Sequence, residues 1–276
     1  MKKVLVTGAG GQLGQALKKA APAHTGLEFY FASSGEVDIT SGESLEAVFS
    51  TFKPDYVINA AAYTAVDKAE TEPEKAQLIN VTGAANLANA CLKYGCALLH
   101  VSTDFVFDGN SITAYTEEDV PNPTGVYGKT KLEGEQQVAA ILPQHYIIRT
   151  SWVYSEFANN FKKTMLRLAA ERDTINVVND QRGTPTNANS LAEALIAIIN
   201  SNKAAYGIYN YSNEGEATWY DFAKKIFEVN NVSINLRPIP TSAFPTPAKR
   251  PAYSVLDKTK IKEVFNLVIP KWQTEV

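Results

Sequence analysis

A tyrosine and a lysine stand four residues apart in the stretch YGKTK, at Tyr127 and Lys131. Residues at this spacing share one face of a helix, with about 5–6 Å between their Cβ atoms. A phenol beside an ammonium can transfer a proton, because the positive charge favours the phenolate. The same spacing recurs at Tyr220 and Lys224, so the surroundings of each pair must decide which one does chemistry.

The surroundings favour the first pair. The stretch LLHVSTDFVFDG predicts a strand that ends at Thr103, and PNPTG supplies a helix-start signal just before Tyr127. In a doubly wound sheet the carboxyl ends of the strands form the ligand crevice, which both residues can reach. The second pair lies in TWYDFAKKIF, beyond the predicted sheet, and is interpreted as part of an ordinary amphipathic helix.

A glycine-rich turn opens the chain. The stretch VLVTGAGGQLG places Gly8, Gly11 and Gly14 between a predicted strand and a predicted helix. Such a turn brings the backbone close to a pyrophosphate and lets the helix pack on the strand. The helix N-terminus then offers free N–H groups and the positive end of its dipole. We expect a dinucleotide cofactor here, with a plain glycine-rich turn as the alternative.

The residues at the end of the second predicted strand indicate whether the cofactor is NAD or NADP. There FYFASS ends with Ser33 and Ser34, at the point where an acid would hold the ribose 2′-hydroxyl of NAD. Neither residue is acidic, and no arginine is present to hold a 2′-phosphate. The sequence therefore allows NADPH and does not exclude NADH.

The elements that must position these residues alternate along the chain. Apolar residues at helical spacing separate short β-branched or aromatic runs. We expect strands at 2–8, 27–34, 55–62, 95–103 and 145–152, and helices at 14–23, 44–52, 73–94 and 128–142. This alternation predicts an α/β fold with a doubly wound parallel (Rossmann) sheet.

The regular alternation of predicted strands and helices ends after residue 150. We expect helices at 156–173 and 190–201 and strands at 175–187 and 207–213, followed by an irregular tail at 231–276. The sequence thus predicts a dinucleotide-binding domain at 1–150, to which 188–213 return. Residues 151–187 and 214–276 would form a smaller, mostly irregular and helical, substrate-binding subdomain.

Composition excludes several classes of protein. The net charge is −3 and no basic run is long, which argues against nucleic acid or an anionic membrane as partner. The N-terminal apolar run is too short for a signal peptide, and no apolar stretch is long enough to span a bilayer. Cys91 and Cys96 are too few for a disulfide framework, which indicates a reducing cytoplasm. Three scattered histidines give no support to a metal site, and His100 is expected to be a satisfied core residue.

Several blocks, taken in order, resemble the extended short-chain dehydrogenase/reductase family. The likeness is strongest to the branch that reduces the C4 ketone of dTDP-4-dehydro-6-deoxy-L-mannose to dTDP-L-rhamnose. The supporting blocks are NAAAYTAVDKAE, VSTDFVFDG, YGKTKLEGE, RTSWVY, NNF with KTMLRLA, and NDQRGTPT, with KRPAYSVLD nearer the C-terminus.

The resemblance implies a mechanism. NADPH, or NADH, would deliver a hydride to the ketone carbon, and Tyr127 would donate a proton to the oxygen. Lys131 would lower the pKa of this tyrosine and hold the nicotinamide ribose, and Thr103 would bind the substrate oxygen. The dTDP-sugar would be the partner of a monomer or a homodimer.

The resemblance also assigns binding residues. For four of these residues a purely structural role is the alternative. Leu13 and Ile39 could belong to the apolar core, Asp38 could cap the following helix, and Trp152 could serve only in packing. The implied cofactor residues are Gly8, Gly11, Gln12, Leu13, Asp38, Ile39, Ala62, Tyr63, Thr64, Tyr127 and Lys131; the implied substrate residues are Thr103, Asp104 and Trp152.

Two other functions stay open at this point: a nucleotide-sugar epimerase or dehydratase of the same fold, and a non-catalytic regulatory relative. Dehydratases carry an acid where this chain has Phe105, which disfavours dehydration. The substrate diphosphate calls for cations, for which Arg182, Lys249 and Arg250 are the candidates.

Overall fold

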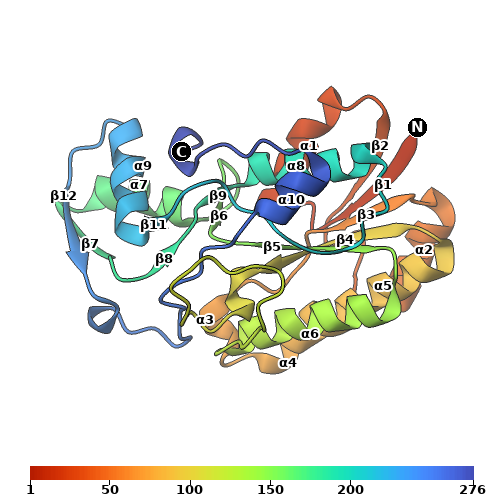
Figure 1. Ribbon diagram of the computed structural model, residues 1–276, viewed down its shortest axis with the longest axis horizontal. Helices are drawn as coiled ribbons and strands as arrows, with labels where there is room; N and C mark the ends of the chain where they lie inside the picture. The colour runs from red at the N-terminus through yellow and green to blue at the C-terminus, as the bar shows by residue number, and fades with distance from the viewer.

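A six-stranded parallel sheet forms the centre of the computed structural model, which describes residues 1–276 (Figure 1). Its strands lie in the order β10-β5-β4-β3-β1-β2. Their bounds are β1 Lys2–Thr7, β2 Leu27–Ala32, β3 Tyr56–Asn59, β4 Ala97–Thr103, β5 His145–Thr150 and β10 Gly207–Asn210. The central strands read as continuous apolar runs because both faces of the sheet are covered.

Helices cover the two faces of the sheet, so the prediction of a doubly wound fold is confirmed. In Figure 1, α1, α8 and α10 lie above the sheet, and α2, α5 and α6 lie below it. Each layer encloses its own apolar core. Their bounds are α1 Gln12–Ala20, α8 Ala188–Ser201, α10 Thr259–Phe265, α2 Gly42–Phe52, α5 Gly83–Tyr94 and α6 Val126–Ile141.

The order of the strands fixes where a ligand can bind. From β1 the chain moves outward to β2 and then returns to β3 on the other side of β1. A crevice opens at such a reversal, at the carboxyl ends of the strands. The glycine-rich turn after β1 lies at this point, as the sequence predicts.

A smaller lobe packs beside the sheet, on the left of Figure 1. Its own core holds residues from α7, α9 and β7, with Trp272 from the C-terminal segment. Its elements are β6 Val153–Tyr154, α7 Phe161–Glu171, β7 Thr174–Val178, β8 Arg182–Gly183, β9 Thr186–Asn187, β11 Ala217–Thr218, α9 Trp219–Val229 and β12 Asn235–Ile239. No helix of the molecule combines the length and the apolar character that crossing a bilayer requires.

The structure differs from the sequence prediction in three elements. The tail is not irregular throughout, since β12 pairs in parallel with β7, and α10 lies in the core of the sheet. Helix α7 begins only at Phe161, because the Asn160 side chain accepts from the Lys163 N–H and caps it there. The remaining short turns are η1 Ala21–Ala23, η3 Asp104–Val106, η4 Thr241–Ala243 and η5 Trp272–Thr274. The domain limits drawn from the sequence remain a prediction, but α10, within 214–276, belongs by packing to the sheet.

The helix predicted at 73–94 contains a wider turn. It consists of α4 Pro73–Gln77, a π-helical turn η2 Leu78–Thr82 and then α5. Single π turns inside a helix often mark functional sites. Here the turn presents Asn80, whose side chain accepts from Tyr63 N and donates to Tyr63 O and to Thr130 Oγ1. The turn therefore fixes the backbone just after β3.

Helix α6 lies unusually close to the end of β4. A Cβ added at Gly128 would come within 2.2 Å of the Phe105 carbonyl oxygen, so only glycine permits this approach. Further along α6, Glu135 forms a buried ion pair with Arg149 of β5, at 2.8 Å. These two contacts hold the helix face of Tyr127 against the carboxyl edge of the sheet.

We expect Gly128→Ala to lower the free energy of unfolding by about 1–3 kcal/mol, because the added methyl group must displace backbone. Chemical denaturation of the purified protein measures this. The matched control is Gly42→Ala at the start of α2, where a Cβ meets nothing within 4 Å. Equal stability of the two variants would show that α6 does not depend on this contact.

Candidate active site

The sheet edge brings together the residues that the sequence singled out. Thr103 ends β4 and its hydroxyl caps η3, accepting from the Phe105 N–H and donating to Asp104 Oδ1. Tyr127 faces this turn from the first turn of α6, and its ring meets that of Phe105 edge-on at 5.5 Å. The pair Tyr220 and Lys224 lies in α9 of the small lobe, as predicted.

Lys131 is buried beneath the strand edge. Only 1% of the residue is exposed, and its Nζ donates to the Val101 carbonyl at 2.8 Å. Burial lowers its pKa to about 8, while the Glu135 carboxylate opposes that shift. This ammonium is therefore held in one place and loses its proton far more easily than a surface lysine does.

The phenol of Tyr127 differs from the expectation. Burial raises its pKa to about 12, the nearby Thr103 hydroxyl opposes this shift, and the Asp104 carboxylate adds to it. The expected lowering by Lys131 does not appear among the causes of this shift, of which desolvation is the largest. The Lys131 Nζ instead donates to the Val101 carbonyl. At neutral pH the site thus presents Tyr127 as a protonated acid.

Asp104 is a buried acid with an incomplete set of partners. It is 1% exposed, and its Oδ2 has no hydrogen-bond partner. Burial raises its pKa to about 6, although the hydroxyls of Ser254 and Thr103 lower it in part. An unpaired oxygen beside the phenol can accept a hydrogen bond from a ligand that enters the site.

The glycine turn is built for a close approach. Gly8 has a left-handed backbone at φ 72°, and a Cβ there would lie 2.6 Å from the Ala60 carbonyl carbon. The first N–H groups of α1, at Gln12 and Leu13, have no acceptor within the helix. This cradle fits a pyrophosphate, so the residues present match a dinucleotide cofactor.

Three predicted cofactor residues have other structural duties. The Gln12 side chain donates to Val153 O and accepts from Ser155 and Asn160, so it ties α1 to the small lobe. Leu13 and Ile39 are buried in the two apolar cores, as their alternative proposed. Only their backbones remain free to line a cofactor.

The other predicted cofactor residues border the crevice. Ala62, Tyr63 and Thr64 follow β3, where Asn80 clamps Tyr63. Asp38 is exposed and its Oδ1 accepts from the N–H and the hydroxyl of Thr40. The cap of α2 is Ser41 instead, so Asp38 is not the helix cap that the sequence left open.

Trp152 is held under strain. Its backbone is left-handed at φ 46°, a conformation that costs about 1–3 kcal/mol and persists where surroundings enforce it. Its indole stacks on Trp219 of α9, with 3.6 Å between the centroids and 7° between the planes. The indole also lies close to Gly183, where a Cβ would sit 2.6 Å from the ring. The ring is therefore fixed at the junction of the two lobes.

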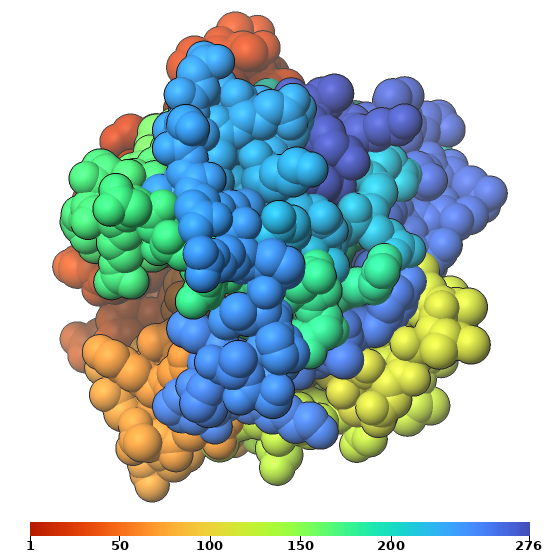
Figure 2. Space-filling view, turned by 90° about the vertical axis from the view of Figure 1, so that its left-hand side faces the viewer, coloured from red at the N-terminus to blue at the C-terminus, as the bar shows by residue number.

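The three cations proposed for a diphosphate are not equivalent. Arg250 makes a bidentate pair with Asp67, at 2.9 and 2.8 Å, which draws the C-terminal segment onto α3 Val66–Ala69. Figure 2 views this face, where the blue C-terminal segment reaches the orange region at the lower left. Arg182 is exposed and 3.9 Å from Glu216, and Lys249 is exposed without a side-chain partner. Lys249 and Arg182 are therefore more available than Arg250 to bind a diphosphate.

His100 is only half satisfied, so that prediction is wrong in part. Asn59 Oδ1 accepts from Thr7 and from the Ala61 N–H, so its Nδ2 donates to His100 Nδ1 at 3.0 Å. The imidazole is therefore neutral with its proton on Nε2, and this atom is buried without a partner. No local signal in the sequence marks this.

Comparisons with known proteins agree with the geometry. Residues 1–276 match the family model described as the RmlD substrate binding domain. The chain is similar to a dTDP-4-dehydrorhamnose reductase of Aggregatibacter actinomycetemcomitans, with 44% identity over 99% of this chain and 96% of the relative. A second reductase of that name, from Escherichia coli K12, is 42% identical over 99% and 95%.

Solved structures show the same likeness. The dTDP-4-dehydrorhamnose reductase of Bacillus anthracis, in complex with NADP, superposes with a TM-score of 0.95 at 39% identity and covers 100% of this chain and 97% of its own. A Thermus thermophilus UDP-glucose 4-epimerase in complex with NAD has a TM-score of 0.80 at 22% identity, covering 99% and 96%, and shares the fold alone.

The buried carboxyl of Asp104 makes stability depend on pH. Its pKa is about 6 in the folded protein against 3.8 as reference, so its protonated form favours folding below pH 4 and this stability is lost as pH rises through 6. Asp104→Asn cannot ionise and so does not lose this stability. We expect its free energy of unfolding, relative to that of the wild type, to rise between pH 4 and 6 by about 3 kcal/mol.

Denaturation curves at several pH values measure this difference. Asp173→Asn, at an exposed carboxylate without a side-chain partner, is the control and should follow the wild type throughout. A constant offset for Asp104→Asn across the pH range would contradict the explanation.

Proposed function

Because the chain belongs to the RmlD substrate binding domain family, we propose that it reduces dTDP-4-dehydro-6-deoxy-L-mannose at C4 to dTDP-L-rhamnose, with NADPH as reductant. The observation that carries this proposal is the full-length match to proteins named dTDP-4-dehydrorhamnose reductase. The sheet edge supports it with a protonated phenol, a buried ammonium and a hydroxyl at one place.

The cofactor would lie along the glycine turn, Tyr63 and Lys131, and when bound it supplies the hydride to the ketone carbon. Tyr127 donates the proton that the reduced oxygen needs. Its raised pKa does not prevent this, because an alkoxide is a stronger base than a phenolate. Burial keeps the proton on the ring until that base forms.

Lys131 and Thr103 support the proton transfer. The Lys131 ammonium, fixed on Val101 O, would hold the nicotinamide ribose and so place the cofactor beside Tyr127. The Thr103 hydroxyl, next to the phenol, holds the substrate oxygen in line. Asp104 offers its free Oδ2 to a sugar hydroxyl, and Trp152 supplies a rigid wall for the ring.

The other functions have less support, and the epimerase named above is only 22% identical, against 39% and 44% for the reductases. Phe105 packs edge-on against Tyr127, so the position that holds an acid in dehydratases is apolar here. A regulatory relative without turnover would not need a buried lysine beside the phenol. We propose in addition that the protein works in the reducing cytoplasm, as a monomer or homodimer, with the dTDP-sugar as its partner; Cys91 and Cys96 are both free thiols in the structure.

The reaction is tested by mixing the purified protein with NADPH and the dTDP-4-keto sugar and following the nicotinamide absorbance. Consumption equal to the sugar added indicates a reductase, whereas an epimerase leaves the reduced cofactor unchanged. No consumption with either NADPH or NADH would overturn the proposal.

We expect Tyr127→Phe to lower kcat by about 10²-fold or more, because the acid is lost while the ring remains. Binding of NADPH, followed by its fluorescence, should persist. The control is Tyr220→Phe, which sits in the other Tyr–Lys pair and should change neither quantity. Near-normal turnover of Tyr127→Phe would remove this residue from the mechanism.

A further inference from the structure

An acid lies at the end of β2 after all. The Glu36 carboxylate folds back and accepts from the N–H of Ser33 at 2.8 Å and from its hydroxyl at 2.7 Å. The backbone closes the same turn, since the N–H groups of Glu36 and Val37 both donate to Ser33 O. These contacts hold the pKa of Glu36 below its usual range, chiefly through the Ser33 N–H.

This turn lies where the adenosine ribose of a dinucleotide must fall. Ser33 directly follows β2, and the glycine turn is adjacent, because Ala9 N donates to Ala32 O at 3.0 Å. In this fold the ribose next to the adenine reaches the end of the second strand. A carboxylate here accepts from a free 2′-hydroxyl and repels a 2′-phosphate.

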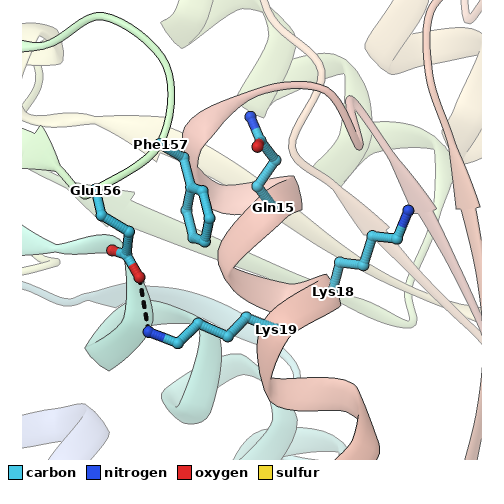
Figure 3. Close-up of a pocket in the computed structure, with 5 residues that line it drawn as sticks. All are labelled: Gln15, Lys18, Lys19, Glu156 and Phe157. Atoms are coloured by element: carbon cyan, nitrogen blue, oxygen red, sulfur yellow. Dashed lines mark hydrogen bonds and ion pairs between the residues drawn. The ribbon is translucent and has the colours of Figure 1, made fainter.

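Helix α1, which follows the glycine turn, carries a free cation at Lys18. Lys18 and Lys19 of α1 both line a hollow of about 470 Å³. Figure 3 shows Lys19 paired with Glu156, at 2.7 Å, while the Lys18 side chain points away from this pair. The Lys18 ammonium has no hydrogen-bond or ion-pair partner, and its charge contributes to the low pKa of Glu36. Lys18 lies on the helix that follows the glycine turn, and this turn bonds to the end of β2 through Ala9 N and Ala32 O.

We propose that Glu36 is an internal competitor for the 2′-phosphate subsite and thereby sets the preference between NADPH and NADH. NADH binds with Glu36 in place, on its 2′-hydroxyl. NADPH displaces the carboxylate from Ser33, whose two donors then hold the phosphate with Lys18 as counter-ion. The proposal deepens the reductase function and rests on it for the cofactor, but its chemistry concerns only the ribose.

The experiment uses fragments that need no catalysis. Calorimetry measures the dissociation constants of adenosine 2′,5′-bisphosphate and 5′-AMP for the wild type and for Glu36→Gln. We expect Glu36→Gln to tighten the bisphosphate roughly five- to thirtyfold, since one negative charge near a phosphate is removed, and to leave 5′-AMP within about twofold. The ratio of kcat/KM for NADPH over NADH should rise in parallel.

Two further variants separate the roles. In the Glu36→Gln background, Ser33→Ala should remove part of the gain, because the hydroxyl donor is lost while the backbone N–H remains. Lys18→Ala should weaken the bisphosphate by roughly tenfold and leave 5′-AMP unchanged, whereas Lys19→Ala, the paired neighbour, should change neither.

An unchanged bisphosphate affinity in Glu36→Gln overturns the proposal, and so does an equal effect of the two lysine variants. Either result leaves the reductase function untouched, because that function is tested by turnover of the sugar. Conversely, a protein that binds the fragments as expected but reduces no sugar would refute only the proposed function.

Discussion

The site depends on how closely helix α6 approaches the backbone at the end of β4. The absence of a side chain at Gly128 lets the helix lie on the Phe105 carbonyl, which no other residue would permit without a shift. Tyr127 and Lys131 flank this contact on the same face. Because the approach is backbone against backbone, the phenol and the ammonium take their places from the rigid part of the fold.

The same close packing makes the site chemically unusual. Once α6 covers the strand ends, ionisable groups lose water, and desolvation becomes the first cause of the pKa shifts of Tyr127, Lys131 and Asp104. The shifts disfavour charge in all three. The phenol and the acid hold their protons longer, and the lysine releases its proton sooner. At neutral pH the phenol is therefore uncharged, while Asp104 and Lys131 still carry opposite charges. Such a site can stabilise charge that appears only during the reaction.

Sequence patterns predicted the features of the site that depend on neighbouring residues in the chain. The glycine turn, the strand ending at Thr103 and the helix of Tyr127 were all readable, because parallel strands bring their carboxyl ends to one edge. Contacts between distant segments were not readable. Arg250 meets Asp67 across 183 positions, and helix α10 joins the core of a sheet that begins at residue 2. Glu36 was missed for a different reason: it is near Ser33 in sequence, but only the folded turn aims its carboxylate back.

The two lobes are joined by a strap at the C-terminal side, which we define as residues 248–256. Its backbone bonds to both lobes, since Tyr253 N donates to Gly109 O, and Arg182 N donates to Ala252 O. Ser254 reaches the buried Asp104 from this strap, and Arg250 fastens it to α3. The acid–base groups therefore stand on η3 and α6, while the strap ties the segment after β4 to the small lobe and to α3. Leu132 of α6 packs against the same apolar cluster as Tyr253 and Leu256 of the strap, so the strap also bears on the helix that carries the phenol.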